Sequence, residues 1–541
     1  MTSNRRQFLR AAAAGMACAN ALRSAESESF IEVLMDEPIA TIAPEIYGHF
    51  AENLGGVVYD GIWVGEDSPV PNIGGVRKQL VEALRRISPP VIRWPGGCFA
   101  DSYDWRDGTG PRAKRPRRTN FWAGAAEWGK HRPHTGPQIY DPNQFGTVEF
   151  TRFCKLSGAQ PYLAANMRGS NPQEFDRWVE YCNSPAGSTT LAGQRAADGE
   201  RESLNVRYWG VGNEAWGCGG NFLPEDYATE FLRFTAWVPG YNLPLAFVGS
   251  GPNGNDRDWT RQVFAKLAEK NALGSLWGWS MHHYAWNASG GRSTDWLAAK
   301  GDALRFDAGQ YYEILREAAQ IESFITSQWD VMGEHDRQHR VKLVVDEWGA
   351  WYASGTEPFA EALLGQQSTM RDAVLAGSTL DTFNRNADKV GLAAIAQLVN
   401  NLQALFLAHE DKFCVTPTYH VFDMYAAHQG AQSLRTVAAA PAIYKGLPGL
   451  SCSASLRGKA LTVTVTNPSM DQTREVDIAL RGASVASAKA VVLAAADVHA
   501  HNTFDSLHAV EPREEQVQAR GARFTRRFPP ASVTKLEIAL A

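Results

Sequence analysis

Two alternating patterns of hydrophobic positions cover most of the chain. Short apolar, β-branched runs typical of buried strands alternate with stretches whose apolar residues recur every three or four positions, as on one face of a helix. Eight strands are predicted, at about residues 46–52, 91–94, 161–167, 206–214, 245–251, 277–284, 341–347 and 390–400. Helices are predicted at about residues 72–87, 142–158, 172–182, 224–237, 256–271, 309–329, 359–386 and 417–428. This alternation favours an α/β fold built on a parallel (β/α)8 TIM barrel.

The pattern changes beyond about residue 431. Helical spacing disappears, and short alternating runs such as Leu461–Asn467 and Ser532–Leu540 take over, which is typical of an antiparallel sandwich. Residues 30–42 also alternate and predict a strand whose partner lies far away in the chain. We therefore expect a barrel at 43–430 and a C-terminal antiparallel β-sandwich domain at 431–541.

The amino terminus resembles a twin-arginine export signal. Arg5 and Arg6 are followed by Phe8, Leu9 and an alanine-rich, weakly apolar segment that ends near Leu22. That segment is too short for a permanent transmembrane helix. The alternative is an alanine-rich amphipathic start of the mature protein. We expect a signal at residues 1–25 and a periplasmic or secreted protein.

Composition argues against several other classes of protein. The formal net charge of −5 over 541 residues gives no support for binding nucleic acid or a membrane surface. The basic run Pro111–Arg118 therefore reads as a solvated loop over the barrel mouth. Seven cysteines without CxxC spacing predict mostly free thiols and no structural zinc site.

The most apolar stretch of the chain is Val390–Ala408. Gln397, Asn400 and Asn401 interrupt it, so a buried strand that leads into a helix is a better interpretation than a membrane span. We expect no stable membrane insertion.

Polar residues gather where the predicted barrel strands end. They are Glu52, Gly96–Cys98, Asn166, Asn213–Glu214, His282–Tyr284, Glu347 and Gln397. The carboxyl ends of the strands form the rim that carries the active site in such barrels. The sequence therefore predicts an active site at this rim.

Two of these residues suit the hydrolysis of a glycosidic bond. Such hydrolysis needs one carboxyl group to protonate the leaving oxygen and a second to attack the anomeric carbon or activate water. Glu214 and Glu347 end the fourth and seventh predicted strands, and we assign them as acid/base and nucleophile. Their neighbour Asp346 is expected to face away from Glu347 by strand alternation and to act as a structural acceptor.

Further rim residues suit the binding of a sugar. Asn213 can donate an amide hydrogen bond to the hydroxyl beside the reacting carbon, and the Tyr284 hydroxyl can hold the nucleophile. Glu52 and Gln397 suit hydroxyls farther round the ring. For each of these four, the alternative is a structural hydrogen bond within the rim.

A catalytic metal is not expected. His282 and His283 are adjacent on a predicted strand, so their side chains point to opposite faces. The chain also contains no HExxH motif.

Several of these segments together resemble the α-L-arabinofuranosidases of glycoside hydrolase family 51. They are Ile46–Asn53, Arg93–Cys98, Trp209–Glu214, His283–Tyr284, Asp346–Trp348 and Ala396–Asn400. The resemblance implies a retaining mechanism without cofactor, a homo-oligomer, and a sandwich that includes the strand at about 29–42. It also implies Glu214 as acid/base and Glu347 as nucleophile, and a furanose pocket lined by Glu52, Cys98, Asn213, Tyr284 and Gln397.

The segment after the acid/base, Ala215–Gly220, departs from the best-known members of that family. Because of this departure, the resemblance does not define which residues contact the leaving group. The resemblance implies an exo-acting enzyme that removes terminal arabinofuranosyl groups from glycans. The alternatives are a β-xylosidase or endo-β-1,4-glucanase on the same scaffold, or a non-catalytic carbohydrate-binding protein.

Overall fold

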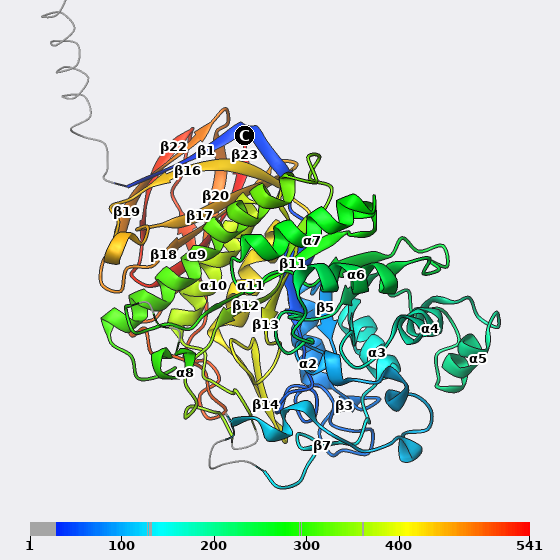
Figure 1. Cartoon of the computed structure of the whole chain (residues 1–541). Coiled ribbons are helices and arrows are strands. Elements are labelled where there is room, and N and C mark those ends of the chain that lie inside the picture. The colour runs from blue at the N-terminus through cyan, green and yellow to red at the C-terminus, as the bar shows by residue number, and fades with distance from the viewer. Residues whose placement is uncertain (1–28, 127, 129–132, 292, 294, 360–361) are drawn as a thin grey trace, which may run out of the picture.

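The computed structural model describes residues 29–126, 128, 133–291, 293, 295–359 and 362–541. The expected export signal at residues 1–25 lies outside the described residues. Figure 1 shows a barrel beside a large sheet, with helices α9 and α10 between them.

Eight strands form a closed barrel, and every pair of neighbours described is parallel. They are β2 (Gly48–Phe50), β5 (Val91–Trp94), β8 (Gln160–Ala165), β9 (Tyr208–Val211), β10 (Ala246–Gly249), β11 (Gly278–Ala285), β12 (Lys342–Ala350) and β13 (Val390–Ala396). Each lies within or close to a strand predicted from the sequence. The predicted (β/α)8 barrel is confirmed.

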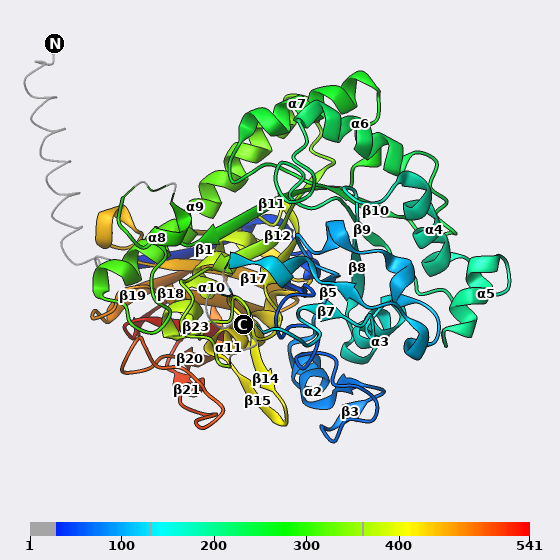
Figure 2. The ribbon, with the colours of Figure 1, turned by 60° about the horizontal axis from the view of Figure 1, so that its bottom comes forward.

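The helices cover the outside of this barrel (Figure 2). They are α2 (Lys78–Ile87), α3 (Thr147–Ser157), α4 (Pro172–Asn183), α5 (Thr190–Ala197), α6 (Pro224–Thr235), α7 (Arg257–Glu269), α8 (Trp296–Ala299), α9 (Ala308–Gly333), α10 (Met370–Arg385) and α11 (Pro417–Tyr425). Three predicted helix starts are wrong. Helix α3 begins five residues later than predicted, at Thr147, where the N–H of Gly146 donates to Glu149 at 2.9 Å. Before α2, the hairpin of β3 (Asn72–Ile73) and β4 (Val76–Arg77) takes up the first residues. Helix α10 starts only at Met370, because Thr369 and Asp372 form a capping box there.

The apolar stretch 390–408 contains two strands and no helix. β13 is followed by a loop and by β14 (Phe406–His409), which pairs with β15 (Lys412–Val415). The helix predicted for the second part of this apolar stretch is therefore wrong, because β14 occupies that position. Within the part of the chain that the structure describes, no helix is long and apolar enough to cross a membrane.

A nine-stranded sheet forms the second part of the molecule. Its order is β21-β20-β23-β18-β17-β16-β1-β19-β22. The bounds are β1 (Phe30–Thr41), β16 (Gln432–Ala439), β17 (Ser451–Arg457), β18 (Ala460–Asn467), β19 (Arg474–Arg481), β20 (Val485–Leu493), β21 (Arg513–Val517), β22 (Arg523–Phe528) and β23 (Ser532–Leu540). The sheet encloses its own apolar core, separate from the core around the barrel.

Strand β1 pairs with residues 391 to 447 positions away. It is antiparallel to β16 and parallel to β19. The predicted strand at 30–42 with a distant partner is confirmed. The described pairs within residues 431–541 are antiparallel, as predicted, and β1 adds the one parallel pair described in this sheet. A strand that enters from before the barrel is free to run in either direction beside β19.

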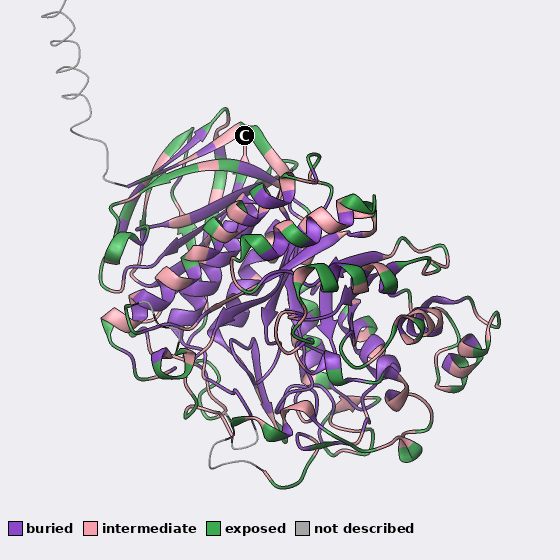
Figure 3. Cartoon of the chain, in the orientation of Figure 1, coloured by how far each residue is buried: buried purple, intermediate pink, exposed green. Residues whose placement is uncertain are grey.

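Helix α10 joins the barrel to this sheet through a buried polar cluster. Its Asp381 accepts hydrogen bonds from Ser453 (2.9 Å), Thr464 (2.6 Å) and Tyr425 (3.0 Å). Burial raises the pKa of Asp381 to about 6, while these hydrogen bonds oppose the rise. Figure 3 shows buried residues, in purple, on both sides of this contact between α10 and the sheet. A buried carboxyl with several donors fixes how the sheet sits on the barrel.

The basic run lies in the long segment between β5 and α3, which also contains the short strands β6 (Arg118–Thr119) and β7 (Tyr140–Asp141). Arg112 and Arg115 both contact Glu149 at 3.0 Å, and Arg118 contacts Asp107 at 2.7 Å. The side chain of Arg115 is only 3% exposed. Pro111, Ala113, Lys114, Arg117 and Arg118 are exposed, so the expectation of a solvated loop holds for most of the run. Arg115 is the exception, because its side chain is buried against Glu149.

Candidate active site

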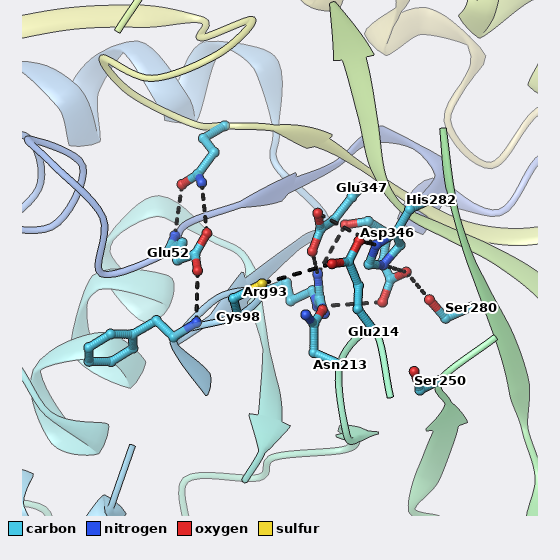
Figure 4. Close-up of polar contacts among 12 residues, drawn as sticks. Glu52, Arg93, Cys98, Asn213, Glu214, Ser250, Ser280, His282, Asp346 and Glu347 are labelled. Carbon is cyan, nitrogen blue, oxygen red and sulfur yellow. Dashed lines mark hydrogen bonds and ion pairs between the residues drawn. The ribbon is translucent and has the colours of Figure 1, made fainter. Parts of the chain in front are cut away.

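The two predicted catalytic carboxylates face one another at the carboxyl ends of β9 and β12 (Figure 4). An oxygen of Glu214 and an oxygen of Glu347 lie within 4.8 Å of each other. Glu347 is 6% exposed, whereas Glu214 is half-buried. The two carboxylates therefore lie close together, and Glu214 is the one nearer to solvent.

Glu347 is held on both of its oxygens. Arg93 donates to Oε1 at 2.8 Å, and the Tyr284 hydroxyl donates to Oε2 at 2.8 Å. Both donors stabilise a negative charge on this carboxylate. A Cβ atom at Gly97 would lie 2.9 Å from Oε1, so only glycine leaves the carboxylate this room.

Arg93 connects the two sides of the site. Its Nη2 donates to Asn213 Oδ1 at 2.6 Å, and its Nε lies 3.4 Å from Asp346. Burial alone would lower the pKa of Arg93, but Asp346 and Glu347 raise it, so the guanidinium stays charged. Its hydrogen bond fixes the amide of Asn213, directly before the acid/base candidate.

The prediction for the direction of Asp346 is wrong. The pairing of β11 with β12 shifts register between Ser280 and His282, so one extra residue of β12 is accommodated there. Asp346 and Glu347 consequently both contact Arg93 and His282. Asp346 also accepts from Tyr162 at 2.8 Å and is 1% exposed, so it is a buried acceptor.

Sequence reasoning did not single out His282. Its Nδ1 lies 3.0 Å from Glu214 and 3.6 Å from Glu347, and its Nε2 lies 3.3 Å from Asp346. Burial alone would lower its pKa, but the three carboxylates raise it to about 10. At neutral pH this imidazole is therefore a cation between three acidic groups. Its position two residues before Tyr284, on the same strand face, was the signal that could have found it.

Arg93 was not singled out either. An arginine in the middle of a buried barrel strand requires acidic or polar partners, which pointed to the barrel interior. Trp122 is a third site residue that was not predicted. It lies in the long loop after β5, where no sequence pattern indicates which residues reach the site.

The other predicted pocket residues form a second cluster beside Glu347. Gln397 donates to Glu52 Oε2 at 3.2 Å and accepts from the Glu52 backbone N–H at 2.9 Å. The backbone of Phe99 and the indole of Trp122 donate to the other Glu52 oxygen at 2.9 and 3.1 Å. Burial and the charge of Glu347 raise the pKa of Glu52 to about 8, against these hydrogen bonds.

Glu52 should make the stability of the protein depend on pH. Its carboxyl keeps a proton in the folded state up to about pH 8, whereas the unfolded chain releases it near its ordinary value of 4.5. Folding stability should therefore fall as pH rises between these values, by on the order of 4 kcal/mol at most. We expect Glu52→Gln to remove this dependence and to raise the melting temperature relative to wild type more at pH 8 than at pH 5. A difference in melting temperature that is constant across this range would contradict it.

The sulfur of Cys98 lies 3.8 Å from a carboxylate oxygen of Glu214, and it is not a free thiol. It forms a disulfide with Cys218, 120 residues away. Cys154, Cys182, Cys414 and Cys452 are free and buried. The expectation of mostly free thiols holds for these four and is wrong for the pair at the site, because spacing in sequence does not show which loops meet.

Some groups of the site lie close enough together to hold a metal ion. Ligand atoms of Glu214, His282 and Glu347 lie within 4.8 Å of one another. A protonated His282 has no lone pair to offer, so it acts in this cluster as a cation itself. His283 points the other way and contacts the carbonyl of Glu317 on α9 at 2.9 Å, as strand alternation predicted.

A (β/α)8 barrel with two facing carboxylates at its carboxyl rim defines a glycoside hydrolase. Residues 83–289 match the alpha-L-arabinofuranosidase 1 domain, and residues 346–532 match the alpha-L-arabinofuranosidase C-terminal domain. The chain belongs to the α-L-arabinofuranosidases of glycoside hydrolase family 51, as its relatives show.

These relatives cover nearly the whole chain. An intracellular exo-alpha-L-arabinofuranosidase of Bacteroides ovatus is 33% identical over 95% of this chain and 96% of its own length. The structure of a GH51 arabinofuranosidase from Xanthomonas axonopodis pv. citri is 34% identical, with a TM-score of 0.85 over 94% of this chain and 100% of that one. The structure of an alpha-L-arabinofuranosidase from Thermotoga maritima, in an arabinose complex, is 28% identical, with a TM-score of 0.80 over 95% and 100%.

Proposed function

We propose that this protein is a retaining, exo-acting α-L-arabinofuranosidase. It releases terminal α-L-arabinofuranosyl groups from arabinose-containing polysaccharides or oligosaccharides. The observation that carries the stereochemistry is the approach of Glu214 and Glu347 to within 4.8 Å. Retaining enzymes place their carboxyl groups about 5–5.5 Å apart, whereas inverting enzymes leave about 6.5–9.5 Å for a water molecule.

In the first step, a Glu347 oxygen attacks the anomeric carbon while Glu214 donates its proton to the departing oxygen. The bond to the leaving group breaks, and an arabinofuranosyl ester of Glu347 forms. Arg93 and Tyr284 hold the Glu347 carboxylate in one orientation before this attack, because each donates to one of its oxygens. Glu214 lies on the more exposed side, where a leaving group can depart to solvent.

In the second step, Glu214 removes a proton from water, and the water oxygen attacks the same carbon. Glu347 leaves as a carboxylate, so two inversions give net retention. Both steps use only side chains of this chain and water.

The charges of the site favour the starting state of this mechanism. Arg93 and His282 are cations, and Asp346 and Glu347 are the anions that they contact. Glu52 holds a proton at neutral pH because its pKa is about 8. Because Glu52 is neutral, the two cations balance the charges of Asp346 and Glu347.

The remaining predicted residues line the sugar side. Asn213, fixed through its Oδ1 by Arg93, can present its Nδ2 to the hydroxyl next to the reacting carbon. A hydrogen bond at that position strengthens as the oxocarbenium-like transition state develops. Glu52 and Gln397 bind each other and can receive hydroxyls farther round the ring.

A panel of substrates tests the activity. We expect 4-nitrophenyl α-L-arabinofuranoside to be hydrolysed with a kcat/KM at least about a hundredfold above that for the β-D-xyloside, because pocket hydrogen bonds reject a ring of different shape. β-Glucan should release no reducing sugar. Faster cleavage of the xyloside or of β-glucan would favour a β-xylosidase or an endo-glucanase instead. Proton NMR of the first product should show the α anomer.

We propose that the enzyme is exported through the twin-arginine pathway and acts in the periplasm or outside the cell. Arg5 and Arg6 before an alanine-rich segment support it, as does the Cys98–Cys218 disulfide, because disulfides persist in oxidising compartments. We expect an Arg5→Lys/Arg6→Lys precursor to remain in the cytoplasm. Activity of that variant in the periplasmic fraction equal to wild type would refute this route.

The homo-oligomer that the family resemblance implies is part of the same proposal. Light scattering on the mature protein should give a multiple of the monomer mass.

A further inference from the structure

The Cys98–Cys218 disulfide joins the two loops that carry opposite parts of the site. Cys98 directly follows Gly97, which lies against Glu347, and directly precedes Phe99, whose N–H holds Glu52. Cys218 comes four residues after Glu214. The bond therefore links the sugar side of the site to the loop of the acid/base.

Both sulfur atoms touch the Glu214 carboxylate. Its Oε2 lies 3.8 Å from Cys98 Sγ and 3.6 Å from Cys218 Sγ, and its Oε1 faces His282 at 3.0 Å. The sulfurs of a disulfide carry no hydrogen, so these are packing contacts without a proton donor. The carboxyl is thus confined between an imidazolium on one side and the disulfide on the other.

The backbone beneath Glu214 needs such support. Glu214 has a φ of 42°, a left-handed conformation that is unfavourable for a residue other than glycine. The following segment contains Gly217, Gly219 and Gly220, which add conformational freedom. Besides the disulfide, the N–H of Ala215 donates to Ser250 at 3.0 Å and the N–H of Gly217 to the Glu214 carbonyl at 2.7 Å.

We infer that the Cys98–Cys218 disulfide is a positioning group for the acid/base, which holds the Glu214 carboxyl where it meets the leaving oxygen. This inference rests on the proposed roles of Glu214 and Glu347. The disulfide acts through Glu214 and not on the sugar.

A misplaced acid affects substrates unequally. An alkoxide from arabinobiose leaves only when it is protonated, whereas 2,4-dinitrophenolate leaves without a proton. The kcat/KM of a retaining enzyme reports the first step, in which Glu214 acts as an acid. Loss of positioning should therefore reduce kcat/KM for the sugar leaving group and spare the dinitrophenyl substrate.

Cys218→Ala is the main test, because it opens the disulfide and leaves Cys98 in the pocket. We expect kcat/KM for arabinobiose to fall about tenfold to a hundredfold, part of the 10²–10⁴ that general acid catalysis supplies. The value for 2,4-dinitrophenyl α-L-arabinofuranoside should fall less than about threefold. The matched control is Cys414→Ala, a buried free cysteine on β15, which should leave the ratio of the two values at that of wild type.

Reduction of the folded wild type tests the same point without a substitution. Dithiothreitol gives two electrons and two protons to the S–S bond, which yields two thiols and cyclic oxidised dithiothreitol. We expect the arabinobiose activity to fall as in Cys218→Ala and to return on reoxidation. Cys218→Ala itself should not respond to dithiothreitol.

Equal losses on both substrates, or no loss on either, would overturn the inference, whether seen in the variant or in the reduced enzyme. The proposed function fails separately. If Glu214→Ala does not distinguish the two leaving groups, the acid/base assignment is wrong. If Glu214→Ala distinguishes them and an opened disulfide does not, only the positioning role is lost.

Discussion

Glu347→Ala is expected to lower kcat by on the order of 10⁵-fold or more on every arabinofuranoside, because removal of a nucleophile costs about 10⁶-fold in enzymes with covalent intermediates. The loss should be the same for good and poor leaving groups, since no covalent ester can form with either. Arg93 and Tyr284, which now donate to Glu347, would face a cavity and bind water. Initial rates with 2,4-dinitrophenyl and 4-nitrophenyl α-L-arabinofuranoside measure this.

Glu347→Asp is the matched control for this prediction. It keeps a carboxylate beside Arg93 but retracts it by one methylene group, so activity should lie between those of Glu347→Ala and wild type. Circular dichroism and a melting curve show whether both variants fold. Azide should restore turnover of Glu347→Ala and give the β-configured azide, because a single displacement inverts the anomeric carbon. An alanine variant as fast as wild type would exclude this nucleophile.

The barrel could be predicted because its signals are local. Each strand is a short apolar run, and each ends in a polar or glycine-containing segment, as Val341–Gly349 illustrates. Burial of the strand and exposure of its end are consequences of the same pattern. The placement of Glu214 and Glu347 at one rim followed directly from that regularity.

The direction of Asp346 could not be predicted, because it depends on an irregularity. Strand alternation places neighbouring side chains on opposite faces, but the register shift between β11 and β12 turns both Asp346 and Glu347 toward Arg93. A bulge is a property of two paired strands and leaves little trace in either one alone. The same shift brings both Asp346 and Glu347 to His282.

Contacts between distant loops were also beyond the sequence. Cys98 and Cys218 are separated by 120 residues, and Trp122 reaches Glu52 from the long loop after β5. Such contacts depend on how irregular segments fold over the rim, which hydrophobic spacing does not encode. The sequence thus predicted the carboxylates of the site better than the groups that hold them.

Glu214→Ala should show the second large effect, and it should depend on the leaving group. We expect kcat/KM for arabinobiose to fall by about 10³–10⁴, since its alkoxide cannot leave without a proton. The dinitrophenyl substrate needs no acid, so its kcat/KM should fall less than about tenfold. Its kcat should fall much further, because the ester of Glu347 then waits for a water molecule without a general base.

Azide separates this role from that of the nucleophile. Azide is an anion that needs no general base, so it should attack the accumulated ester in Glu214→Ala and raise kcat for the dinitrophenyl substrate by about 10²-fold or more. Two successive displacements then give the α-configured azide, opposite to the product of Glu347→Ala. The matched control is Glu214→Gln, which keeps the contacts with His282 and the disulfide but cannot transfer a proton; it should behave like the alanine variant. If both Glu214 variants gave the β azide, the two carboxylates would have to exchange roles, because the anomer records which of them still forms the ester.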